Sequence, residues 1–180
     1  LATNAGSFAR LVGTNGGSIA MTNEGGNIVV GYAGDVAGST NVLDVAGTVS
    51  TAAGGTIGNI NLGNSSDLAD ANLVNLHSSG VLEVHKVSTA SSNHYSEFNF
   101  YGGTLRSIST DGANVFMQGL SNVFVHAGGA VLDSGTNHIT IAQPLLAPIA
   151  GPSGGLTKQG TGTLVLDGTN TYTGLTTISA

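Results

Sequence analysis

The feature that most constrains the fold is a pair of glycines followed by a short run of alternating apolar and polar residues. Such pairs begin at Gly16, Gly25, Gly54, Gly102 and Gly128, and Gly154-Gly155 opens a variant in which Leu156 follows directly. Alternation with a period of two is typical of a strand with one buried face, and glycine pairs mark turns. Since no window repeats apolar residues at helical spacing, we expect less than roughly a tenth of the residues to be helical. The pattern therefore predicts an all-β chain.

Short strands separated by Gly and Asn fit a sandwich, a barrel or a solenoid. The glycine pairs recur at uneven intervals, hairpin signals are weak, and polar loops of variable length separate the strands. Insertions of this kind are tolerated at one edge of a stack, which favours a solenoid. At roughly 20 to 25 residues per turn the chain would make about eight turns, in a rod roughly 40 Å long. We expect the side chains of Phe98, Phe100, Leu164 and Leu166 to point inward.

The charge pattern excludes several classes of partner. Only 8% of the residues are charged and the net charge is −6, with permanent cations only at Arg10, Lys86, Arg106 and Lys158. Nucleic acid and anionic membranes require clustered Lys and Arg, so neither is an expected partner. No apolar run approaches the length of a membrane span. Cysteine is absent, which excludes disulfides and thiolate metal sites.

Two local patterns could indicate catalysis. Residues 151–155 match G-x-S-x-G, yet a nucleophile elbow needs a strand before and a helix after Ser153, whereas prolines and a β-repeat surround it. We interpret these residues as a glycine-rich loop. Glu83 and His85 are two apart in the expected strand 81–87 and would share one face, where a carboxylate can orient an imidazole. We interpret that face as solvated, with Leu82 and Val84 in the core.

No metal or cofactor site is predicted. The five histidines lack ligand spacing, and Asp67 with Asp70 lacks the pattern of a calcium loop. Stacked turns could still bring Asp44, Glu83 or Glu97 together, as a glycan-cleaving β-helix would require. We therefore expect no catalytic, cofactor-binding or metal-binding residues, and keep a glycan-cleaving β-helix as the alternative.

The sequence GGLTKQGTGTLVLDGTNTYTG of residues 154–174 resembles the autotransporter-associated β-strand repeat, also called the passenger-associated transport repeat. The resemblance extends over residues 154–180 and departs at Leu175, where a small residue is more usual. The positions that carry it are Gly154, Gly155, Leu156, Lys158, Gly160, Gly162, Leu164, Leu166, Asn170, Tyr172 and Gly174. It implies a right-handed, single-stranded parallel β-helix exported across the outer membrane of a Gram-negative bacterium. The repeat is then a structural element that aids transport and folding, with no active site.

We accordingly expect residues 1–180 to form one β-helical segment of a larger precursor, displayed outside the cell. Its expected role is that of a stalk, fibre or adhesin scaffold without enzymatic activity. The alternative is a polysaccharide-binding or polysaccharide-cleaving β-helix that uses Tyr32, Tyr95 or Tyr101 as stacking platforms. We expect the partners to be further coils of the precursor or a second copy, because open strand edges recruit strands. Any host or glycan receptor is unspecified, and no membrane insertion is expected.

Overall fold

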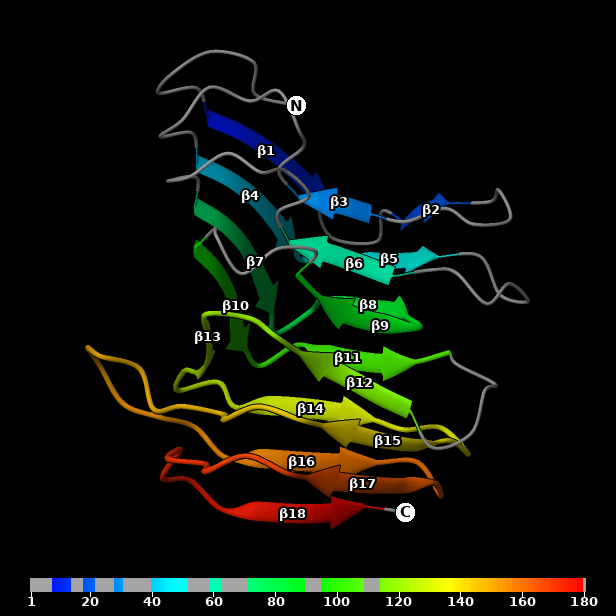
Figure 1. The fold of residues 1–180 in the computed structure, drawn as a ribbon, viewed down its shortest axis with the longest axis vertical. Helices are drawn as coiled ribbons and strands as arrows, with labels where there is room; N and C mark the ends of the chain where they lie inside the picture. Colours follow the sequence, from blue (N-terminus) through cyan, green and yellow to red (C-terminus); the bar gives the residue numbers. More distant parts are fainter. Residues whose placement is uncertain are drawn as a thin grey trace.

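The computed structural model describes residues 8–13, 18–21, 28–30, 40–51, 59–62, 71–89, 95–108 and 114–179. Within them the chain forms short strands and no helix, and the strands stack into three parallel sheets (Figure 1). Each of the first five turns contributes one strand to each sheet, and the last strands of the chain extend only two of the three sheets. This arrangement is a parallel β-helix and confirms the predicted fold class. In the described part no helix could cross a membrane.

The three sheets are named by their strands. Sheet A contains β1 (Phe8–Gly13), β4 (Thr40–Val45), β7 (Ala71–His77), β10 (Tyr95–Tyr101) and β13 (Asn122–Val125). Sheet B contains β2 (Ser18–Met21), β5 (Thr48–Thr51), β8 (Val81–Val84), β11 (Thr104–Ser107), β14 (Ala130–Asp133), β16 (Leu156–Gln159) and β18 (Thr176–Ser179). Sheet C contains β3 (Ile28–Val30), β6 (Asn59–Leu62), β9 (Lys86–Ser88), β12 (Asn114–Gln118), β15 (His138–Ile141) and β17 (Thr163–Leu166).

The turns are longer and more variable than the sequence pattern predicts. Sheet B has the most strands, seven, whereas about eight turns were expected. Asn41 and Asn72, in register on successive turns, are 31 residues apart, while Asn75 and Asn99 are separated by 24. Loops between strands absorb the difference, so the strands remain stacked in register.

The core is a set of inward-facing apolar columns, one residue from each turn. In sheet A, Leu43, Val74 and Phe98 are in register and almost fully buried, and the ring of Phe98 lies 4.7 Å from that of Phe100. The inward direction expected for both phenylalanines is therefore correct. Leu164 and Leu166 also pack against the core but stay partly exposed, because β17 is the last strand of sheet C.

The glycine pairs lie at the corner between sheets A and B, where backbones of successive turns approach closely. A Cβ added to Gly103 would lie 2.3 Å from the carbonyl oxygen of His77, and one added to Gly154 would lie 2.4 Å from that of His126. The Gly102 N–H donates to the carbonyl of Gly129 at 2.9 Å. Only glycine fits such contacts, which explains the pairs beginning at 102, 128 and 154. The pairs at Gly16, Gly25 and Gly54 lie outside the described residues.

Between β15 and β16, where Pro144, Pro148 and Pro152 fall, the chain forms a lateral bulge. Leu146 pairs in parallel with Phe124 and extends sheet A by one bridge. The chain then projects away from the stack (Figure 1), and Ile149 in this projection is 94% exposed. The chain returns at Ser153, which bridges to His126.

Candidate functional site

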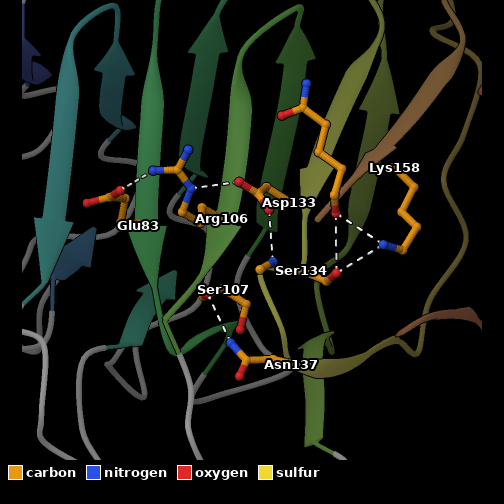
Figure 2. Close-up of polar contacts among 9 residues, drawn as sticks. Glu83, Arg106, Ser107, Asp133, Ser134, Asn137 and Lys158 are labelled. Carbon is orange, nitrogen blue, oxygen red and sulfur yellow. Dashed lines mark hydrogen bonds and ion pairs between the residues drawn. The ribbon is translucent and has the colours of Figure 1, made fainter. Parts of the chain in front are cut away.

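A ladder of charged side chains crosses the outer face of sheet B (Figure 2). The parallel register aligns Glu83, Arg106 and Asp133 on consecutive turns. The Arg106 guanidinium donates from Nη1 to Glu83 Oε1 at 2.6 Å and from Nε to Asp133 Oδ2 at 2.7 Å. One cation thus links three turns of the stack. We call these three residues the charge ladder.

The electrostatics of the charge ladder fit an ion-pair network. Hydrogen bonding to Asp133 raises the pKa of Arg106 further, against the opposing effect of partial burial. Partial burial acts to raise the pKa of Asp133, but the Gly135 N–H and Arg106 outweigh it, so that the pKa falls below its usual value. Both groups are therefore charged near neutral pH. Since the carboxylates are engaged by Arg106, the ladder holds turns together.

Beside the charge ladder, Lys158 caps the corner between sheets B and C. Its ammonium donates to Ser134 Oγ at 3.1 Å and to the carbonyl of Gln159 at 3.1 Å. The pair resembles a serine–lysine dyad. However, Ser134 is fully buried, and Lys158 Nζ also donates to the backbone carbonyls of Gln159 and Gly160. The contact is that of a structural cap.

The outer face of sheet A carries a column of stacked rings. Tyr101 lies between His77 and His126, with centroid distances of 5.4 and 4.1 Å and nearly parallel planes. Burial lowers the pKa of His126, and the charge of Glu97 acts in the opposite direction. Burial raises the pKa of Tyr101. We call these three residues the aromatic column.

A second column of amides and a carboxylate runs beside the rings. Asn75 Nδ2 donates to Asp44 Oδ1 at 2.8 Å, and Asn99 Nδ2 donates to Asn75 Oδ1 at 3.1 Å. The two columns are joined, since His77 Nε2 lies 3.3 Å from Asp44 Oδ1 and His126 Nε2 lies 2.8 Å from Asn99 Oδ1. The outer face of sheet A is therefore a continuous polar network.

Tyr95 and Glu97 extend this network toward the start of β10. The Tyr95 hydroxyl donates to Glu97 Oε2 and accepts from Asn122 Nδ2 at 3.1 Å. Glu97 Oε1 accepts from Asn99 at 2.6 Å. Burial and the hydrogen bond to Glu97 raise the pKa of Tyr95, so its hydroxyl stays protonated at neutral pH.

The structure corrects the expectation that Glu83 and His85 share one solvated face. Glu83 points outward into the charge ladder, but His85 is only 6% exposed. The alternation is interrupted because β8 ends at Val84, and His85 forms the bend before β9. Both ring nitrogens of His85 are buried without a hydrogen-bond partner. The two side chains do not share a solvated face.

The structure joins two of the three acids considered for a catalytic cluster. Asp44 and Glu97 belong to the network on sheet A through Asn75 and Asn99, whereas Glu83 lies on sheet B. Within the described side chains, no group of three or more His, Asp or Glu is placed to hold a metal ion. Asp67 and Asp70 lie outside the described residues, as does Tyr32.

Ser153 is tied to the backbone of neighbouring turns. Its Oγ donates to the Val125 carbonyl at 3.1 Å and accepts from the Thr173 N–H at 3.2 Å. Between β15 and β16 the described chain has neither the preceding strand nor the following helix of a nucleophile elbow. The serine helps to anchor the bulge.

The repeat residues contact the preceding turn. A Cβ on Gly162 would lie 2.0 Å from the Asn137 carbonyl oxygen, and one on Gly174 would lie 2.3 Å from the Gly155 nitrogen. Asn170 Oδ1 accepts from the Leu145 N–H at 2.8 Å. Three other repeat positions also stack on the preceding turn: Gly154 on Gly129, Gly160 on Gly135 and Leu156 on Ala130; Gly155 instead contacts Leu175 of the following turn. Tyr172 packs against the core and its hydroxyl lies 2.7 Å from Thr176 Oγ1.

The three-sided parallel stack, with glycine corners and outward polar ladders, defines a β-helical segment. A comparison with family models supports this class, because residues 156–180 match the passenger-associated-transport-repeat. Residues 156–180 thus carry an autotransporter passenger repeat. No curated protein and no solved structure matches the chain.

Proposed function

We propose that this chain is a non-enzymatic, surface-exposed β-helical segment that acts as a stalk or adhesin scaffold. The observation that carries the proposal is the use of the polar side chains. Arg106, Lys158 and Asn170 each bond to a neighbouring turn. Side chains arranged in this way stabilise a rod through nearest-neighbour contacts.

The passenger repeat supports export as the context of this role. Its glycines and Asn170 complete the stack at β16 and β17, which is the contribution expected of a folding element. A mature rod outside the cell would then present its outer sheet faces to the medium.

The test is to export the chain as the passenger of an autotransporter barrel and to treat intact cells with protease. We expect a resistant β-rich core outside the cell. Purified chain incubated with a panel of polysaccharides should release no reducing ends. Sugar release that is lost in Glu83→Gln or Glu97→Gln would refute the non-enzymatic role and favour the glycan-cleaving alternative.

We further propose that the isolated 180-residue chain associates end to end. In the described part, β17 and β18 have no strand beyond them, and Leu175 and Ile178 are 86% and 73% exposed. Unpaired strand edges with apolar side chains recruit further strands. A heterologous contact of this kind that does not close gives a filament.

Sizing across concentrations, with electron microscopy, tests this association. We expect oligomers that grow with concentration, and Ile178→Lys should weaken them by placing a charge at the edge. The control is Thr140→Lys, since Thr140 lies in β15, which is paired on both sides. A chain that stays monomeric at every concentration would rule out end-to-end association.

A further inference from the structure

The outer face of sheet A combines an exposed ring with fixed hydrogen-bonding groups. Tyr95 is 42% exposed, and the residue in register on the preceding turn is Ala71, which has only a methyl side chain. The Tyr95 hydroxyl is held by Glu97 and Asn122. The ring is therefore fixed in place before any ligand arrives, so that binding costs little ordering entropy.

Tyr101 has a different role on this face. Its two ring faces are covered by His77 and His126, so it cannot stack on a ligand. Its hydroxyl edge remains accessible, because the residue is 36% exposed. Tyr95 is thus the ring with an available apolar face, and Tyr101 supplies a hydroxyl on the same strand, β10.

Glu97 and Asn122 lie directly beside the Tyr95 ring. Glu97 already accepts hydrogen bonds from Tyr95 and Asn99. A carboxylate has about four acceptor sites, so Glu97 keeps capacity for a ligand hydroxyl. Asn122 likewise keeps its amide oxygen as an acceptor. An apolar ring bordered by such groups matches a sugar, which has an apolar C–H face and hydroxyls around its rim.

The charge of the face selects among glycans. Of its described side chains, Asp44 and Glu97 are acidic. Arg106 and Lys158 lie on sheet B, Lys86 lies on sheet C, and Arg10 lies in β1, three strands away from β10 in sheet A. The whole chain carries a net charge of −6. Like charges across an interface disfavour association, so uronate or sulfated polymers fit poorly.

We propose that the outer face of sheet A, centred on Tyr95, binds a neutral glycan. The C–H face of one sugar packs on the Tyr95 ring, while its hydroxyls donate to Glu97 and to the side-chain oxygen of Asn122. The site rests on the proposed function, because it requires the rod to face the external medium. It converts the scaffold into an adhesive surface with a stated ligand class.

The test uses the 180-residue chain and neutral hexose and N-acetylhexosamine oligosaccharides, with oligogalacturonates as the anionic comparison. Isothermal titration calorimetry measures binding in the parent and in every variant, because tyrosine fluorescence would lose its reporter in the variants that replace Tyr95. We expect a neutral oligosaccharide to bind and Tyr95→Ala to weaken it at least about tenfold. Tyr95→Phe should retain most of the affinity, because it keeps the ring face. Glu97→Gln should weaken binding because it removes the charged acceptor.

The matched control is Val115→Ala, because Val115 is similarly exposed but lies on sheet C. It should leave glycan affinity unchanged. Thermal unfolding of each variant separates loss of the site from loss of the fold, and Tyr95→Phe remains informative if Tyr95→Ala unfolds. The site proposal is overturned if no neutral glycan binds, if only oligogalacturonates bind, or if Tyr95→Ala binds as the parent does. A folded, protease-resistant rod in those cases would leave the scaffold proposal intact.

Discussion

Replacing Phe100 by Ala tests whether stacked inward columns hold the rod together. Phe100 is fully buried and lies in register between Leu76 and Val125 on the adjacent turns. Its ring also packs against Phe98 at 4.7 Å. Removing a buried Phe side chain costs about 3 to 5 kcal/mol of unfolding free energy.

The upper part of this range is expected for a structural reason. The free-energy cost of removing a buried side chain depends on how far the surrounding residues collapse into the cavity that it leaves. Here the backbone ladders keep successive strands about 4.8 Å apart, so neighbouring turns cannot approach to fill the space. Because each turn contacts only its neighbours, the loss is concentrated around β7, β10 and β13. A second unfolding transition is therefore also expected.

Denaturant titration followed by circular dichroism and by tyrosine fluorescence measures this change. The control is Val165→Ala, whose side chain is outward and 37% exposed, and which should change stability by less than about 0.5 kcal/mol. A loss below about 1 kcal/mol for Phe100→Ala would refute the reasoning. It would mean that the register is shifted by one residue, which turns Phe100 to the outside.

Four further predictions concern the corners, the ladder, pH and the serine motif. Gly162→Ala should destabilise the chain by about 1 to 3 kcal/mol, because its Cβ meets the Asn137 backbone, while the neighbouring exposed Thr161→Ala should have little effect in the same titration. Arg106→Leu should cost about 1 kcal/mol in low salt and less in high salt, whereas a loss independent of salt would contradict an ion-pair role. His126 has a folded pKa below its usual 6.5, so the stability that it contributes above that pH should decline as pH falls below it; His126→Gln should flatten this part of a pH series of melting temperatures. Ser153→Ala should abolish no hydrolase activity, and an esterase or glycosidase activity that disappears in this variant would overturn the loop interpretation.

The fold could be predicted from the sequence because its signals are local. Alternating runs such as residues 71–77 retain their period in β7, where every second side chain is buried. The glycine pairs at 102, 128 and 154 mark corners because a Cβ there collides with the next turn. These features depend only on what a short segment can bury and how tightly it can turn.

The candidate sites could not be predicted in the same way. Arg106 reaches Glu83 and Asp133 from 23 and 27 residues away, and those separations depend on loops of variable length. The prediction that His85 faces outward is wrong, because the alternation of buried and outward residues restarts at the bend between β8 and β9. The sequence of residues 81–87 looks like one continuous strand and gives no sign of this bend. The aromatic column likewise joins three turns and leaves no local pattern. One weak signal existed, in that His77 and Tyr101 end β7 and β10 while His126 directly follows β13.

The passenger repeat makes sense as an element built on the turn before it. Its glycines meet the backbone of Gly129, Gly135 and Asn137, and Lys158 bonds to Ser134. Asn170 holds the Leu145 N–H, which sits in the chain that extends sheet A. None of these partners lies within residues 156–180, where the internal contacts include the pairing of β16 with β18 and the contact of the Tyr172 hydroxyl with Thr176. A strand pair or a single turn cannot bury its apolar face alone, and it gains stability only against a neighbour. The repeat positions are therefore determined by the turn that precedes them. For this reason a family match of only 25 residues occurs in a chain whose β-helical fold extends through the described strands.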